Sequence, residues 1–192
     1  ATGKTTNALE EVVDAYFKKT GEAKDKINSI KQDHINICKG LFGDQDSGVY
    51  DQIENLMVEL EWQIEEERFD SYDYIYDQIV SVGEMLSSAI LSHYLNHFGV
   101  NNEWLDVRDV LKTDDTYRES VINWEVSTQK VEEILKPMLE RNTVVSQGFI
   151  GSTDDNCTTT LGREGSDYTA AVFANILDAE SQTIWKDVPG VM

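Results

Sequence analysis

Basic side chains are scarce in this chain, whose 192 residues include 16 lysines and arginines against 36 aspartates and glutamates, for a formal net charge of −20. Proteins that bind nucleic acid or an anionic membrane surface use lysine and arginine to neutralise phosphates. We therefore expect neither nucleic acid nor membrane among the partners. An anionic ligand must be held by local cations and backbone N–H groups against the general negative field.

Cysteine and long apolar runs are also nearly absent. The two cysteines, Cys38 and Cys157, form no C-x-x-C pair, and a reducing cytoplasm is the simplest compartment. No run is long and apolar enough to span a bilayer, and none has the pattern of a signal peptide. The hydrophobic share of 40% is sufficient for a core, and the length suits one α/β domain or a large piece of one.

The first half of the sequence has helical periodicity. We predict a helix capped by Thr6 or Asn7, helices over 22–39 and 49–67, and a long helix over 75–98. Residues 20–77 make up an acidic helical subregion, in which the charge run over 65–73 is typical of a solvated helix end. The tyrosines interleaved near its end are interpreted as packing residues.

The second half alternates between the two kinds of structure. Strands are predicted over 104–107, 143–150, 158–161 and 183–188, and helices over 131–139, with a bend at Pro137, and 166–178. Strand, helix and strand at this spacing indicate βαβ crossovers and a parallel sheet. The predicted class is α/β, with a mostly parallel central sheet and a helical first half.

The stretch 148–167 is the most informative part of the chain. Gly162 and Gly165 allow a tight turn around Arg163, and Ser166 and Asp167 are residue types that cap a helix. A helix N-terminus favours an anion, and an arginine can grip a carboxylate with two parallel hydrogen bonds. The turn therefore suits a small molecule that carries a carboxylate or a phosphate.

Several segments together resemble aspartokinase, of the amino acid kinase family. Residues 160–171 (T-L-G-R-E-G-S-D-Y-T-A-A) are similar to the family's T-L-G-R-G-G-S-D run, and 184–190 (I-W-K-D-V-P-G) to its I-W-T-D-V-[DP]-G run. Weaker matches are 148–151 with a preceding strand end, 81–87 with S-x-G-E-x-L-S, 1–7 with the end of a G-x-T-N loop, and 106–113 with a D-x-R…T element. They follow the family's order over nearly the whole chain.

The resemblance implies a three-layer α/β/α sandwich of the carbamate kinase-like type. It implies that the γ-phosphoryl of ATP, accompanied by Mg²⁺, is transferred to the side-chain carboxylate of L-aspartate, a carboxyl acceptor. The product is 4-phospho-L-aspartate, an intermediate in lysine, threonine and methionine biosynthesis. A cytoplasmic homodimer is expected for the full-length enzyme.

The resemblance also implies that residues 1–192 are a partial catalytic domain. The family's K-F-G-G-T-S strand, with its lysine, is expected before Ala1, and the remaining nucleotide segment and regulatory ACT domains after Met192. Phosphoryl transfer depends on positioning and on cationic stabilisation. We therefore expect residues 1–192 alone to be inactive.

The family's site residues carry over by position. Arg163 is expected to grip a substrate carboxylate, Glu84 to face the ammonium, and Thr6 to contact the aspartate. The remaining assignments are Asp167 as catalytic, Phe149, Glu164, Gly165 and Ser166 as substrate-binding, and Lys186 and Asp187 as ATP-binding. The plainer alternatives are a surface ion pair for Arg163, a solvent-facing carboxylate for Glu84, a helix cap for Thr6 and a buried strand residue for Phe149.

Two residues depart from the family pattern. Glu164 replaces the usual glycine and places a negative charge beside the expected anion site, so its side chain must point to solvent. Lys186 replaces the usual threonine at the nucleotide contact. No metal site is predicted, because His93 and His97 lack an H-E-x-x-H motif.

Two other functions remain open. The chain could be the kinase module of a bifunctional aspartokinase–homoserine dehydrogenase, which the sequence beyond Met192 would decide. It could instead be a noncatalytic, acidic helical interaction module. Glu84, Arg163 and Asp167 discriminate between a kinase and such a module, because a substrate site requires them to lie at one cleft.

Overall fold

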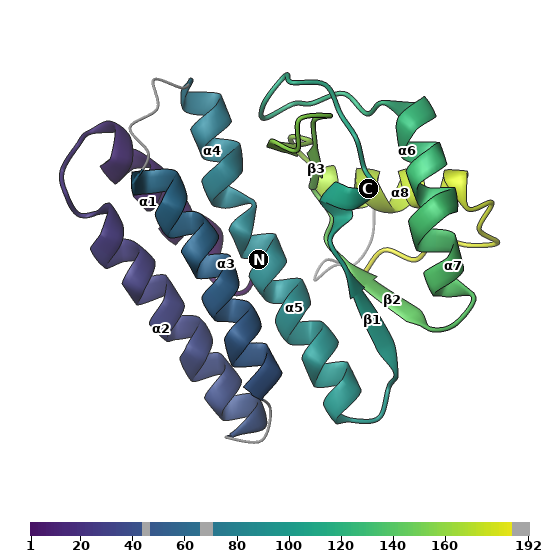
Figure 1. The fold of residues 1–192 in the computed structure, drawn as a ribbon, viewed down its shortest axis with the longest axis horizontal. Helices are drawn as coiled ribbons and strands as arrows, with labels where there is room; N and C mark the ends of the chain where they lie inside the picture. The colour runs from purple at the N-terminus through teal and green to yellow at the C-terminus, as the bar shows by residue number, and fades with distance from the viewer. Residues whose placement is uncertain (44–46, 66–70, 186–192) are drawn as a thin grey trace.

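A computed structural model describes residues 1–43, 47–65 and 71–185 (Figure 1). Figure 1 shows α1 to α4 gathered on one side of the molecule, the strands and later helices on the other, and α5 between them. The first five helices are α1 (Thr5–Phe17), α2 (Ala23–Phe42), α3 (Ser47–Glu65), α4 (Tyr72–Val80) and α5 (Val82–His97). The helical first half is therefore confirmed, and α2, α3 and the start of α4 lie within the predicted acidic subregion 20–77.

Apolar stripes on these helices form the core of the first half. Leu9, Ile27, Ile53, Met57 and Ile79 are all fully buried. The spacing of such residues on each helix places them on the face turned toward its neighbours. The predicted cap of the first helix is wrong, because α1 already begins at Thr5 and its N-cap makes no side-chain hydrogen bond.

The predicted helix over 75–98 is divided into α4 and α5. Ser81 lies between them with φ −57° and ψ −29°, which are helical values, and its hydroxyl donates to the carbonyl of Gln78 at 3.2 Å. The two helices therefore follow one another along nearly the same line (Figure 1). Residues on α4 are thus placed rigidly with respect to residues at the start of α5.

The predicted βαβ crossover is confirmed. Strand β1 (Asn102–Leu105) pairs in parallel with β2 (Thr143–Ser146). The connection contains the 3₁₀ turn η1 (Val107–Asp109), α6 (Trp124–Lys130), the π-helical segment η2 (Val131–Leu135) and α7 (Lys136–Leu139). Helix α5 packs on both strands and α7 packs on β2, which gives helix, sheet and helix layers. The helix irregularity is η2, and Pro137 lies just after it in the first turn of α7.

The strand predicted over 143–150 is interrupted. Phe149 has φ +74°, which ends extended structure, so the chain forms β2 and then β3 (Ile150–Ser152). Strand β3 pairs antiparallel with β4 (Thr158–Thr160), and α8 (Gly165–Ile176) follows. The strand predicted over 183–188 is not formed at 183–185, and its other residues lie outside the described ranges. No helix in the described ranges has the length and apolarity needed to cross a membrane.

Candidate functional site

The turn between β4 and α8 has the tight geometry that its glycines predict. Gly162 has φ +74°, a conformation that glycine adopts without strain. Glu164 also lies in the left-handed region, with φ +57° and ψ 22°, and α8 begins at Gly165. Capping by Ser166 and Asp167 is therefore wrong: both lie in the first turn of α8, and the N-cap is Glu164, whose side chain makes no capping hydrogen bond.

Phe149 is held against the start of α8. Its N–H donates to Oγ1 of Thr169 at 3.0 Å, and its carbonyl accepts from the N–H of Leu161 at 2.8 Å. A Cβ on Gly165 would lie 2.7 Å from Cδ2 of Phe149, so this glycine is required by close packing. A non-glycine residue with positive φ is strained, and strain of this kind is concentrated at functional sites. Because the backbone of Phe149 is bonded to Thr169 and Leu161, it fixes the turn that carries Arg163.

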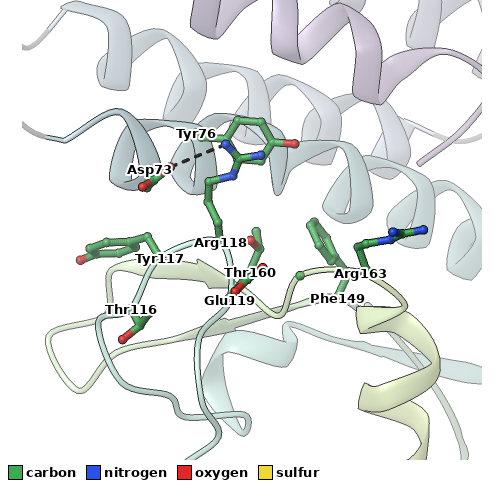
Figure 2. A pocket seen from close by; sticks show the side chains of 10 residues that line it. Asp73, Tyr76, Thr116, Tyr117, Arg118, Glu119, Phe149, Thr160 and Arg163 are labelled. Atoms are coloured by element: carbon green, nitrogen blue, oxygen red, sulfur yellow. Dashed lines mark ion pairs between the residues drawn. The ribbon is translucent and has the colours of Figure 1, made fainter.

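A cleft of about 560 Å³ opens beside this turn (Figure 2). Its wall contains Phe149, Gly162 and Arg163 from the turn region, and it is completed by Asp73, Tyr76, Thr116, Tyr117, Arg118, Glu119 and Thr160. Figure 2 shows Arg118 extending toward α4, whereas Arg163 extends from the turn on the side of Phe149. The cleft thus joins the β4–α8 turn to helix α4.

Arg163 differs from the other described arginines. Arg108, Arg118 and Arg141 each form an ion pair with a carboxylate. Arg163 is exposed, and in the described ranges it makes no ion pair, although the protein has 36 acidic residues. The alternative of a surface ion pair therefore finds no support there.

Arg118 and two residues of α4, Asp73 and Tyr76, form the wall of the cleft that faces the β4–α8 turn. The guanidinium of Arg118 lies 4.1 Å from the ring centroid of Tyr76, and its Nη1 lies 3.6 Å from a carboxylate oxygen of Asp73. The hydroxyl of Tyr76 donates to Glu10 at 2.8 Å. Burial, and next the hydrogen bond to Glu10, raises the pKa of Tyr76 to about 12. Tyr76 therefore packs as predicted, but it also lines the cleft.

Asp77, which sequence reasoning missed, is fully buried behind this wall. Its carboxylate accepts hydrogen bonds from the N–H of Arg118 at 2.9 Å and from the N–H and Oγ1 of Thr160, both at 2.8 Å. Burial raises the pKa of Asp77 to about 6, and these hydrogen bonds oppose the rise. In the sequence this residue only ends an acidic stretch, and no signal there marks it as buried.

Glu84 lies in the first turn of α5, and Thr6 lies in the first turn of α1. The first turns of α1 and α5 pack closely, because a Cβ on Gly83 would lie 3.5 Å from Cγ2 of Thr5. The carboxylate of Glu84 is about one quarter exposed and accepts from the N-terminal ammonium of Ala1 at 2.7 Å. Neither Glu84 nor Thr6 lines the cleft, and no ion pair within the described ranges joins Glu84 to Arg163. Their roles stay predictions, as does that of Asp167 in α8.

Gln147 connects α5 to the segment before Phe149. Its Nε2 donates to Oγ of Ser88 at 2.7 Å, and its Oε1 accepts from the N–H of Val107 at 2.8 Å. Ser88 lies one turn after Glu84 on α5. The helix that carries Glu84 is thus fastened to the segment that carries Phe149.

The predicted nucleotide residues Lys186 and Asp187 lie outside the described ranges. His93 contacts Oε1 of Gln52 at 3.0 Å, and the ring of His97 lies 5.8 Å from that of Phe42. Across 1–43, 47–65 and 71–185, no three His, Cys, Asp or Glu side chains are grouped so as to hold a metal ion.

Comparison with known proteins identifies the family. The amino acid kinase family matches residues 2–192. Lysine-sensitive aspartokinase 3 of Escherichia coli (strain K12) is 33% identical over 171 residues, which cover 89% of this chain and 38% of that protein. The chloroplastic bifunctional aspartokinase/homoserine dehydrogenase 1 of Zea mays is 28% identical over 198 residues, which cover 96% of this chain and 21% of that protein.

Solved structures give the same result. The crystal structure of E. coli aspartokinase III in complex with lysine and aspartate (T-state) aligns with a TM-score of 0.88 at 32% identity, covering all of this chain and 42% of that one. The structure of the same enzyme with aspartate and ADP (R-state) aligns with a TM-score of 0.87. This chain therefore spans about two fifths of that enzyme's length, and the expected α/β fold is confirmed. The chain belongs to the amino acid kinase family.

Proposed function

We propose that the protein to which this chain belongs is an aspartokinase, which transfers the γ-phosphoryl of ATP to the side-chain carboxylate of L-aspartate. The observation that carries the proposal is Arg163, an exposed cation that lacks an ion-pair partner in the described ranges and stands at a cleft beside the start of α8. Similarity to E. coli aspartokinase III, whose structures contain aspartate and ADP, supports this choice of substrates.

Each end of the amino acid has a partner in this proposal. Arg163 donates two parallel hydrogen bonds to the α-carboxylate, the contact that a guanidinium makes best. The start of α8, with the N–H of Ser166, adds the partial positive charge of a helix N-terminus, while the N–H of Gly165 donates to the carbonyl of Gly162 at 3.2 Å. Glu84 accepts from the ammonium, and Thr6 and Phe149 line the amino acid. Glu164 takes part through its N–H while its exposed side chain faces solvent.

In the reaction, an oxygen of the substrate's side-chain carboxylate forms a bond to the γ-phosphorus. The bond from that phosphorus to the β,γ-bridging oxygen breaks, and its electron pair leaves on ADP. Because one anion approaches another, orientation and cationic stabilisation supply most of the rate. We assign Asp167 the catalytic role, in the first turn of α8.

The nucleotide part of the proposal rests on resemblance. Lys186 and Asp187 are proposed to contact ATP, and Mg²⁺ is proposed to arrive with the nucleotide. A cytoplasmic homodimer is likewise proposed for the whole protein. Either a monofunctional aspartokinase or the kinase module of a bifunctional enzyme fits, since relatives of both kinds match.

The test uses the natural full-length protein. ADP release is measured with L-aspartate, L-glutamate and D-aspartate, and hydroxylamine is added to trap the acyl phosphate as its hydroxamate. We expect ADP release and hydroxamate only with L-aspartate, and loss of both in Arg163→Ala but not in Arg141→Ala, whose arginine is an exposed ion-pair partner of Glu103. Equal turnover with and without L-aspartate would disprove the proposal, as would full activity of Arg163→Ala. Residues 1–192 alone should show no turnover.

A further inference from the structure

Two consecutive side chains of α4, Asp77 and Gln78, form hydrogen bonds to the backbone of β4 along the edge that does not pair with β3. They occupy the place that a further strand would take. Nε2 of Gln78 donates to the carbonyl of Thr158 at 2.7 Å, and Oε1 of Gln78 accepts from the N–H of Thr158 at 3.1 Å. The primary amide of Gln78 thus pairs with Thr158 as a peptide group would. Asp77 only accepts at Thr160, whose N–H and hydroxyl both donate to its carboxylate at 2.8 Å.

Asp77 also holds the loop that precedes α6. Its Oδ2 accepts from the N–H of Arg118 at 2.9 Å, while the N–H of Ser120 in the same loop donates to the carbonyl of Thr160 at 2.9 Å. Arg118 has φ +70°, a strained conformation that these contacts stabilise. One buried carboxylate therefore ties together α4, β4 and the loop that lines the cleft.

This contact lies between the two groups of predicted substrate residues. Thr160 ends the strand that leads directly into the turn with Arg163. Helix α4 continues almost in line into α5, where Glu84 follows Asp77 by about two helical turns. Moving Asp77 away from Thr160 would therefore change the separation between the turn of Arg163 and the helix of Glu84.

We propose that Asp77 is a positioning residue, which holds the turn of Arg163 and the helix of Glu84 at the separation that L-aspartate requires. The choice of L-aspartate as the substrate rests on the proposed function. The contacts of Asp77 with Thr160 and Arg118 do not depend on it. The N–H groups of Arg118 and Thr160 both donate to Oδ2 of Asp77, and the hydroxyl of Thr160 donates to Oδ1. Asparagine has nearly the same shape, but it removes the negative charge that strengthens these hydrogen bonds, and its NH₂ group would force the hydroxyl of Thr160 to accept instead of donate.

The experiment compares full-length wild type with Asp77→Asn and with Asp14→Asn, a control whose aspartate pairs with Lys18 at the surface. Because asparagine lacks the charge that strengthens these hydrogen bonds, we expect Asp77→Asn to raise KM for L-aspartate by about tenfold or more. KM for ATP should change by less than about twofold, since only the amino acid spans the two segments. Thr160→Val, which removes one donor and leaves Asp77 in place, should raise KM for L-aspartate by a smaller factor and serves if Asp77→Asn does not fold.

A second readout does not depend on activity. Hydrogen exchange of the Thr158, Thr160 and Arg118 amides should be faster in Asp77→Asn than in wild type, and unchanged in Asp14→Asn. Unchanged exchange would overturn the positioning role even if the enzyme proves to be an aspartokinase. A folded Asp77→Asn that raises both KM values equally would also overturn it. If the wild-type protein does not turn over L-aspartate, the proposed function is wrong. The hydrogen-exchange result would then still show whether Asp77 holds these segments together.

Discussion

Gly165 and Phe149 touch so closely that a single methyl group on the glycine would lie 2.7 Å from Cδ2 and 3.2 Å from Cα of the phenylalanine. The second of these is a backbone atom, which cannot rotate away. Phe149 is already in a left-handed conformation and is bonded to α8 through Thr169. The contact therefore makes the position of the turn depend on the absence of a side chain at residue 165.

The substitution Gly165→Ala tests this contact. Overpacking of a well-packed site costs about 1–3 kcal/mol, so the free energy of unfolding should fall by about that amount. Gly40→Ala is the matched control: nothing lies within 4 Å of its Cβ position in α2, and it should raise the same quantity by about 0.5 kcal/mol. Urea unfolding followed by circular dichroism measures both. Equal stabilisation by the two substitutions would show that the contact is not tight.

Arg163→Lys keeps the positive charge but loses the two-pronged geometry. We expect affinity for L-aspartate to fall by about tenfold, because lysine donates from a single point. Calorimetric titration of the full-length protein with L-aspartate gives the value. Arg141→Lys should leave it unchanged, and an Arg163→Lys protein that binds as tightly as wild type would show that the guanidinium shape is irrelevant.

Glu164 places both a left-handed conformation and a negative charge beside Arg163. Glu164→Gly removes both, whereas Glu164→Gln removes only the charge. We expect both variants to bind L-aspartate more tightly, by about threefold, as expected for a partly screened surface charge. Only the glycine variant should gain stability, by about 1 kcal/mol at most, through relief of the φ +57° conformation. Calorimetry and urea unfolding separate the effects, and unchanged affinity in both would place the charge out of range of the ligand.

Asp77 should give the stability a distinct pH dependence. Its pKa in the folded chain is about 6, above the value of about 3.9 for an unfolded aspartate, so the folded chain binds the proton more tightly. Arg118 is the charged group that opposes this shift. Between about pH 4 and about pH 6, Asp77 should therefore make the free energy of unfolding fall as the pH rises.

The measurement is urea unfolding across this pH range for wild type and Asp77→Asn. The difference between the two proteins isolates this residue from the other carboxylates, and it should change steadily between about pH 4 and about pH 6 and level off outside that range. A difference that does not vary with pH would mean that Asp77 has an ordinary pKa in the folded chain.

Local sequence signals were sufficient for much of the fold. Apolar periodicity predicted α1, α2 and α3 to within a few residues, because each helix buries one continuous stripe. Residues 148–167 predicted the glycine turn and the helix after it, since positive φ and helix initiation are set locally. The same signals supported membership of the amino acid kinase family.

Other features depend on contacts between distant segments. The apolar pattern of 143–150 favours one strand, but the left-handed Phe149 that divides it is stabilised by Thr169. Asp77 looks like one more residue of an acidic helix, and only Thr160 and Arg118 show why it is buried. The facing wall of the cleft could not be predicted, because it is assembled from residues of α4 and a loop distant in sequence.

The side chains along β4 have a consequence for behaviour in a crowded solution. Outer strands with free backbone groups invite pairing with a second molecule, which leads to aggregation. At Thr158 both backbone groups are occupied by Gln78, and at Thr160 they are occupied by Asp77 and Ser120. These contacts leave no backbone group of Thr158 or Thr160 free for intermolecular β-pairing, so the side chains of α4 that hold the hairpin also protect its border.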